Sequence, residues 1–462
     1  MQVPLQILCF PLLISPLVAQ ETSTAPPASA PVASAVQVSN GPGAAFQFTK
    51  IDLALLNEAN AVDAQYEAKG LVFHDPDVQA FLDSVGARVL ANRPVPEKVT
   101  YRFMVLRDPV VNAFSLPNGS VYITTGLLAL LENEAQLAGV LGHETAHVYE
   151  RHSYIENRSI RKKNVAIAII AAAANLAPGG AVYGLAAAAA AEVSSLIVVE
   201  TVYGYSRDLE RQADRDGLIA MTAARYDPHA MAVAFELLDQ DRTLEYEPTP
   251  TFYHDHPKLV ERRSDALAFA DANTPSGAKT GSKQDYLVAL APAIRSNIDT
   301  DIQSRRLRTA VARATRLAEA FKDNPQDQIL LGESYRELGA KTVNPTQDEL
   351  THDGEAKQRK ELLKMTEDQE QQDLLSTPEG RATLKKNRDT AENLFLSVIQ
   401  NHPDYAIAYR ELGFLYEDEA RFADAATQYQ HYLMLVASTS LDRLRIERRL
   451  ALVQNRQNPS EH

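Results

Sequence analysis

Residues 132–147 read Glu-Asn-Glu-Ala-Gln-Leu-Ala-Gly-Val-Leu-Gly-His-Glu-Thr-Ala-His, and the rest of the chain is interpreted around them. Residues four apart on a helix are separated by about 40° and about 6 Å of rise, so His143 and His147 project from one face. Two imidazoles in this arrangement can bind a single metal ion, with Glu144 beside it. The apolar residues around them recur at helical spacing and predict a core-facing helix: Leu131, Leu137, Val140, Leu141 and Val148.

A carboxylate next to a metal with two histidine ligands is the arrangement found in zinc peptidases, where it takes a proton from water. Two ligands do not complete such a site. The variant with a third histidine six residues beyond His147 fails, because that position is Ser153. His152 is expected about 180° around the helix from His143, where it cannot share the metal.

A third ligand is available further along the chain, in the segment 206–214. Glu210 and Asp214 are four residues apart, so their carboxylates share one face of a predicted helix. Glu210 could complete a His-His-Glu set, and Asp214 could accept the outer N–H of a ligating imidazole. Taken alone, this segment would be an ordinary charged surface helix. The upstream motif favours the metal interpretation.

Composition narrows the class of protein and the chemistry of the metal ligands. The chain has 462 residues, 45% of them hydrophobic and 23% charged, which is typical of globular proteins with two or three domains. A net charge of −14 argues against a nucleic-acid partner. The one cysteine, Cys9, falls in an apolar N-terminal segment. If that segment is removed, the mature protein has no thiol, and histidine and carboxylate must hold the metal.

The N-terminal residues have the composition of a targeting segment followed by a tether. An apolar run at 3–19 predicts a secretory signal peptide over residues 1–20, although no Lys or Arg precedes Lys50. Residues 21–45 are rich in Ala, Pro and Ser and predict a disordered tether. Together they predict secretion.

Residues 46–271 are expected to form the metal-binding domain. Helical patterns cover 51–69 and 76–92, the second beginning with Asp75 as N-cap and Pro76 in the first turn. Strand patterns cover 101–106 and 120–125, with a turn at Pro117-Asn118-Gly119 between them.

An alanine-rich stretch at 165–204 interrupts this domain. Glu192 and Glu200 divide its second half, which disfavours a membrane-spanning helix. We expect a buried or lid-forming helical hairpin. The alternative is peripheral contact with a membrane surface or a substrate.

A polar linker at 272–285 leads to a helical region at 286–456. A charged stretch at 350–383 predicts an exposed helical insertion. The pentapeptide Tyr-Arg-Glu-Leu-Gly occurs at 335 and at 409, although this spacing is no clean multiple of a repeat length. The alternative to repeats is a generic helical bundle. The pattern of large and small residues is typical of tetratricopeptide repeats at Ala391, Phe395, Pro403, Tyr409, Leu412, Gly413, Tyr416, Ala425 and Tyr429.

This set of motifs resembles the gluzincin peptidases that include HtpX and the CAAX prenyl proteases, with a helical tail like that of periplasmic members. The residues that carry the resemblance are the HExxH motif, Glu210 with Asp214, the segment 112–117, and His256-Pro257 with Arg262. It implies Zn²⁺ held by His143, His147 and Glu210, and Glu144 as general base. One departure from the family pattern is Asn118, where glycine is common.

The resemblance also implies roles for residues outside the metal ligands. His256 would approach the metal as a fourth, latent ligand, with His254 as the alternative. Arg262 would stabilise that loop or a developing oxyanion, and Asp214 would assist catalysis. An edge strand would pair with extended substrate through Asn112, Ala113, Phe114, Ser115 and Leu116.

We therefore expect a mainly α fold with a small β-sheet, an α+β zincin-type peptidase domain, followed by an all-α tetratricopeptide domain. The expected function is a periplasmic zinc endopeptidase that cleaves misfolded or misassembled envelope proteins, with repeats that recruit substrate or outer-membrane assembly machinery. The alternative is a periplasmic chaperone or scaffold whose site is plugged by His256. An integral-membrane prenyl protease is disfavoured, because sustained apolar runs are lacking.

Overall fold

The computed structural model of the chain describes residues 46–91, 93–162, 205–241, 259–339 and 375–457. Several sequence-based expectations lie outside these residues. They are the signal peptide at 1–20, the tether at 21–45, the stretch 165–204, both His254 and His256, and most of the insertion at 350–383. Within the described ranges, the helices are all too short or too polar to cross a bilayer.

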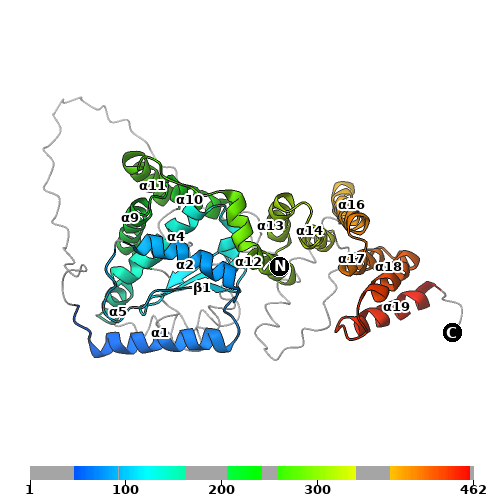
Figure 1. The fold of residues 1–462 in the computed structure, drawn as a ribbon, viewed down its shortest axis with the longest axis horizontal. Coiled ribbons are helices and arrows are strands. Elements are labelled where there is room, and N and C mark those ends of the chain that lie inside the picture. Colours follow the sequence, from blue (N-terminus) through cyan, green and yellow to red (C-terminus); the bar gives the residue numbers. More distant parts are fainter. Residues whose placement is uncertain (1–45, 92, 163–204, 242–258, 340–374, 458–462) are drawn as a thin grey trace, which may run out of the picture. The chain divides into compact units, whose positions relative to one another are not determined.

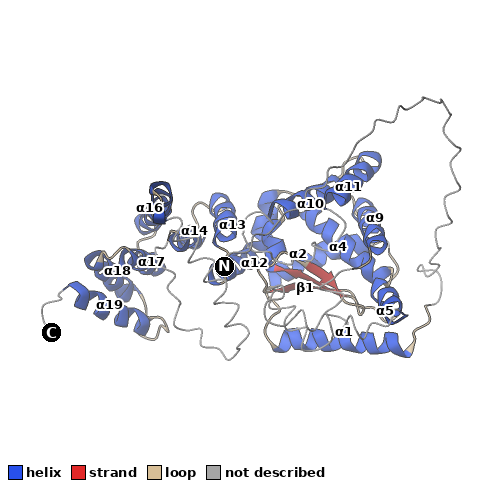
Figure 2. Ribbon diagram, turned by 180° about the vertical axis from the view of Figure 1, so that it is seen from behind, coloured by secondary structure: helices blue, strands red, loops and turns tan. Residues whose placement is uncertain are grey.

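A three-stranded sheet lies at the centre of the first part of the chain, drawn in red in Figure 2. Its strands are β1 (Arg102–Leu106), β2 (Ala113–Ser115) and β3 (Ser120–Thr124), in the order β1-β3-β2. Strand β3 is parallel to β1 and antiparallel to β2, with Phe114 opposite Tyr122. The two strands expected from alternation are confirmed, and β2 occupies an edge of the sheet.

Helices cover both faces of this sheet (Figure 1). On one face Tyr66 of α1 contacts Tyr122 edge-on, with ring centroids 5.2 Å apart. On the other face α4 packs against β2 and β3. The helices of this part are α1 (Lys50–Ala68), α2 (Pro76–Leu90), α3 (Thr125–Leu130), α4 (Glu134–Tyr149), α5 (His152–Lys162), α9 (Arg207–Ala223), α10 (His229–Asp241) and α11 (Leu259–Asn273).

Local capping explains where the first two helices begin. Thr49 and Asp52 form a capping box at the start of α1, and the carboxylate of Asp75 accepts two backbone N–H bonds at the start of α2. The expected helices at 51–69 and 76–92 are therefore confirmed to within two residues. The N-cap and the proline in the first turn of α2 are where the sequence placed them.

A buried carboxylate fixes the turn between β2 and β3. Asp63 of α1 accepts hydrogen bonds from the Tyr122 hydroxyl at 2.6 Å, the Ser120 hydroxyl at 2.9 Å and the Asn118 amide at 2.7 Å. Asn118 therefore links the turn to α1. Gly119 has φ of +99°, and a Cβ there would lie 2.6 Å from the Thr100 carbonyl oxygen, so this position requires glycine.

The second part of the chain is helical. Its first helix, α12, packs against the first part, and the Tyr286 hydroxyl donates to the Leu128 carbonyl at 3.1 Å. The expected boundary at 285–286 thus falls inside α12. The helices are α12 (Lys283–Gln303), α13 (Leu307–Ala320), α14 (Pro325–Leu338), α16 (Pro378–Asn401), α17 (Ala406–Asp418), α18 (Phe422–Leu435) and α19 (Arg443–Gln457).

Two helix pairs in this region share one packing contact. Gly332 of α14 faces Phe395 of α16, and Gly413 of α17 faces Tyr429 of α18, each with no room for a Cβ. The motif that recurs in three dimensions is therefore Leu-Gly-x-x-Tyr, at 331–335 and 412–416. The two copies of Tyr-Arg-Glu-Leu-Gly do not occupy equivalent places, because one ends α14 and the other lies near the start of α17.

Candidate metal centre

The HExxH motif lies in the second half of α4, as expected. The Asn133 side chain caps this helix by accepting a hydrogen bond from the Gln136 backbone at 3.0 Å. Residues 135–148 of α4 are all buried, because the sheet and other helices surround them. His143, Glu144 and His147 are therefore held within the core, each less than 5% exposed.

Three possible ligand atoms converge between α4 and α9. The Nε2 atoms of His143 and His147 lie 3.0 Å apart. The Glu210 carboxylate places Oε1 3.4 Å from Nε2 of His147 and Oε2 3.6 Å from Nε2 of His143. A tetrahedral zinc site with bonds of about 2.0–2.1 Å has ligand atoms about 3.3–3.4 Å apart. The cluster of His143, His147 and Glu210 thus fits such an ion in both spacing and donor chemistry.

Asp214 and Arg262 form an ion pair behind this cluster. Oδ1 of Asp214 lies 2.9 Å from Nδ1 of His143, the nitrogen that faces away from the other ligands. Arg262 of α11 donates to both carboxylate oxygens of Asp214, at 2.7 and 2.6 Å, and its guanidinium stacks over the Phe235 ring. These contacts favour a role for Arg262 in holding Asp214 in place.

Contacts within the site shift the pKa values of Asp214 and His143. Burial alone would raise the pKa of Asp214, but the charge of Arg262 and the hydrogen bond to His143 hold that pKa well below its ordinary value. Burial alone would lower the pKa of His143, but Asp214 outweighs it and raises that pKa. Asp214 is therefore ionised and can accept a hydrogen bond from Nδ1–H of His143.

Glu144 lies beside the cluster with the properties of a general base. Burial is the main cause that raises its pKa to about 7, and the negative charge of Glu210 adds to it. His143 and the nearby Ser115 hydroxyl act in the opposite direction. Among the described residues, no hydrogen-bond donor reaches Oε1 of Glu144. A buried carboxylate with a pKa near neutrality and a free acceptor oxygen can exchange protons with a reactant.

His152 and Tyr205 also contact the cluster, and sequence reasoning assigned neither of them a role there. Nδ1 of His152 lies 3.0 Å from Nδ1 of His147, and burial lowers the pKa of His152 to about 4. The Tyr205 ring stacks on His147 with centroids 4.0 Å apart, and its hydroxyl bonds Ser153 at 2.7 Å. The expected geometry assumed a continuous helix, but α4 ends at Tyr149.

In the predicted substrate segment, residues 112–116, backbone groups alternate between those that pair with β3 and those that point away from it. The Asn112 carbonyl accepts from the Thr124 backbone, and the Leu116 backbone donates to the Ser120 carbonyl. Hydrogen-bonded positions alternate in an antiparallel pair, so the backbone groups of Ala113 and Ser115 point away from β3. Both residues are nevertheless buried, Ala113 at 0% and Ser115 at 8% exposure. The side chains of Phe114 and Leu116 are packed in the hydrophobic core.

These elements define a class of protein. A helix with HExxH, a carboxylate ligand from a second helix and an adjacent buried glutamate constitute the site of a gluzincin-type metallopeptidase. Residues 76–269 match the family model described as Peptidase family M48. This part of the chain is therefore an M48 metallopeptidase domain.

Named relatives share this domain. A Vibrio cholerae protein named as a beta-barrel assembly-enhancing protease is 30% identical over 50% of this chain and 47% of its own length. The beta-barrel assembly-enhancing protease of Yersinia pestis is 27% identical over 49% of this chain and 45% of its own. Mitochondrial metalloendopeptidase OMA1 of Schizosaccharomyces pombe is 35% identical over 29% and 36%. The chain thus spans less than half of the length of these relatives.

Proposed function

We propose that this chain is a zinc-dependent endopeptidase. The observation that carries the proposal is the convergence of two imidazole nitrogens and a carboxylate at 3.0–3.6 Å, with Glu144 beside them. Two nitrogens and an oxygen form a donor set that suits Zn²⁺, and the three protein ligands leave a fourth position for a reactant. The M48 match and the metalloendopeptidase names among the relatives support the same chemistry.

Each residue of the site has a defined task in this mechanism. His143, His147 and Glu210 would hold a zinc ion, which would supply Lewis acidity toward the peptide carbonyl and toward water near neutral pH. Glu144 accepts the proton of the attacking water and passes it to the leaving nitrogen. Asp214, held by Arg262, keeps the outer N–H of His143 in place, so that its Nε2 stays directed at the cluster.

Backbone pairing supports a broad substrate range. The backbone groups of Ala113 and Ser115 point away from β3 and are buried, so an extended peptide would add to this edge once the residues that cover it move aside. Such hydrogen bonds do not depend on substrate sequence. Unfolded or misassembled chains expose long extended segments. We infer misfolded or misassembled envelope proteins in the periplasm as the substrate class, from this edge, the signal-like residues 1–20 and the names of the relatives.

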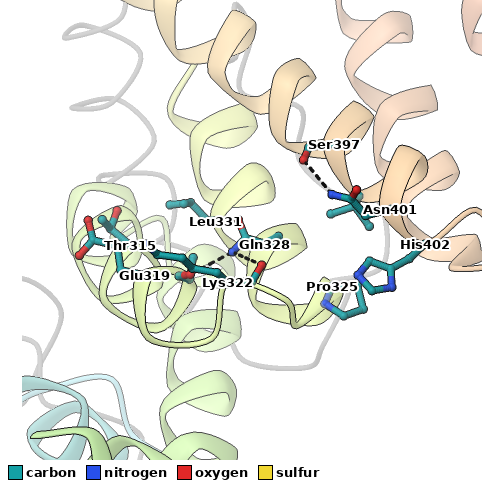
Figure 3. A pocket seen from close by; sticks show the side chains of 11 residues that line it. Thr315, Glu319, Lys322, Pro325, Gln328, Leu331, Ser397, Asn401 and His402 are labelled. Atoms are coloured by element: carbon teal, nitrogen blue, oxygen red, sulfur yellow. Dashed lines mark hydrogen bonds between the residues drawn. The ribbon is translucent and has the colours of Figure 1, made fainter.

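The helical region supports a recruiting role. We infer that α14 with α16, and α17 with α18, are tetratricopeptide repeats, because both pairs share the same glycine-to-aromatic contact. A pocket of about 340 Å³ lies between α13, α14 and α16, with polar side chains such as Glu319, Lys322 and Gln328 in its wall (Figure 3). A substrate segment or an outer-membrane assembly partner would bind in this region.

Substitution of the proposed base tests the activity. Glu144→Gln keeps the size of the side chain but removes the proton acceptor, so cleavage of an unfolded protein should fall about 10²–10⁴-fold. Zinc content should stay at that of the wild type, because the ligands are unchanged. Glu132→Gln, at an exposed ion pair with Lys283, serves as the control and should cleave normally. Equal cleavage by wild type and Glu144→Gln would show that Glu144 is not the general base.

A further inference from the structure

His152 is a fully buried histidine that belongs neither to the proposed ligands nor to the proposed base. It is the first residue of α5, and it contacts the site through one nitrogen. Its Nδ1 lies 3.0 Å from Nδ1 of His147, and its Nε2 lies 3.4 Å from Oε1 of Gln212 on α9. His152 therefore connects a proposed ligand on α4 to the helix that carries Glu210.

A break in the helix brings His152 to this place. On a continuous helix, residue 152 would lie about 140° around and about 7.5 Å along from His147, out of reach of its ring. Helix α4 instead ends at Tyr149, and Arg151 adopts a left-handed conformation with φ of 60°. This conformation is unfavourable for a residue with a Cβ. The Arg151 guanidinium stacks over the Phe46 ring at 4.0 Å, which helps to stabilise the reversal.

The contact has one consistent assignment of protons. Nε2 of His147 faces His143 and Glu210, so this nitrogen must present its lone pair to a metal. The proton of the neutral imidazole then resides on Nδ1. His152 must accept it with its own Nδ1, which leaves the His152 proton on Nε2, directed at the Gln212 carbonyl oxygen. Every nitrogen in this chain of contacts then has a complementary partner.

We propose that His152 is the positioning residue for His147, fixing its tautomer and ring orientation by accepting the Nδ1 proton. The inference rests on the proposed metallopeptidase function. The two histidine ligands then differ in the residue that accepts their Nδ1 proton. His143 has an anionic partner in Asp214, whereas His147 has a neutral one in His152. Tyr205, stacked on the His147 ring, restricts the same ring from its face.

Zinc affinity of the metal-free protein distinguishes a positioning role from packing. Three full-length proteins would be compared by competition with a chelator: wild type, His152→Leu and His152→Asn. Leucine fills space but accepts no proton, so its affinity should be 10–100-fold weaker. Asparagine can place Oδ1 near the former Nδ1 position, so its affinity should stay within about threefold of wild type. Bound Co²⁺ should show altered visible bands in His152→Leu only.

The outcomes separate this inference from the function on which it rests. Unchanged affinity in His152→Leu, or equal weakening in both variants with intact helical circular dichroism, would overturn the positioning role. A wild type that binds no zinc would overturn the proposed function itself. If His152→Leu does not fold, His152→Phe replaces it, because phenylalanine keeps a ring against Tyr205 and offers no acceptor. Its affinity should fall by the same 10–100-fold, and wild-type affinity would count against the proposal.

Discussion

Gly142 of α4 and Gly217 of α9 face each other where the two helices cross. A Cβ on Gly142 would lie 2.9 Å from the Gly217 carbonyl oxygen, and a Cβ on Gly217 would lie 2.8 Å from the His143 backbone nitrogen. Both obstacles are backbone atoms, which cannot move aside as a side chain can. The pair of glycines therefore permits the close approach that brings Glu210 and Asp214 to the histidines.

Gly217→Ala should separate the helices and weaken the site. Overpacking at a buried crossing typically costs about 1–3 kcal/mol of unfolding free energy, and zinc affinity should fall with it. Gly139→Ala on α4 is the matched control. Its Cβ would lie 3.3 Å from Cβ of Met231, so a shift of a few tenths of an ångström would relieve the contact, and alanine favours a helix over glycine by about 1 kcal/mol. Thermal unfolding and chelator competition measure both quantities. Wild-type values for Gly217→Ala would exclude this role for the crossing.

Asp214→Asn should reduce both stability and metal affinity. Arg262 is 3% exposed and its other carboxylate partner, Glu210, lies 3.9 Å away, so removing the charge of Asp214 should cost at most about 3–5 kcal/mol. The neutral amide oxygen that replaces the anionic acceptor behind His143 holds the Nδ1 proton less strongly, so zinc binding should weaken, by up to about 10–100-fold. Asp208→Asn is the control on the same helix. Its side chain is 93% exposed, and Arg211 is its one ion-pair partner among the residues that the structure describes, so its effect should stay below about 1 kcal/mol. Similar losses in both variants would refute the special role of Asp214.

Local sequence patterns predicted the elements of the site well. The apolar period placed His143 and His147 on a buried helix, and the four-residue spacing of Glu210 and Asp214 placed both on one face of a second. Both are consequences of helical geometry, which depends on neighbouring residues alone. That Glu210 meets the two imidazoles depends on how the helices cross. Gly142 and Gly217 permit that crossing, and no periodicity marks it.

Residues whose roles depend on distant or unusual backbone were not predictable. His152 reaches His147 only because Arg151 turns the chain through a left-handed conformation, which glycine or asparagine would signal but arginine does not. The partner of Arg262 could not be read from the sequence either, because Asp214 lies on another helix. Phe114 was expected at the substrate edge, but alternation along β2 turns its ring into the core.

Substrate pairing with β2 predicts a regular dependence on peptide amides. If a substrate adds to the edge formed by Ala113 and Ser115, alternate substrate N–H groups bond to β2 and the others point away. In a cleaved peptide methylated at one amide nitrogen at a time, inhibition of cleavage should recur every second residue. Measured kcat/KM values would show this period. Inhibition that is uniform along the peptide, or confined to the scissile bond, would argue against strand addition.

His229 should make stability depend on pH at the junction of α10 and α11. Its Nδ1 lies 2.8 Å from Asp227 and its Nε2 lies 3.1 Å from Asp271. Hydrogen bonds to Asp271 and then Asp227 raise the pKa of His229 above its ordinary value of 6.5. The stabilisation is therefore complete below about pH 6.5, the pKa of an unfolded chain, and is lost as pH rises through the higher folded pKa. His229→Gln should unfold more easily than wild type at pH 5.5, and this difference should shrink by pH 9.

His74→Gln, at an exposed pair with Glu67, is the control. A difference for His229→Gln that is the same at both pH values would show that the protonated imidazole contributes nothing.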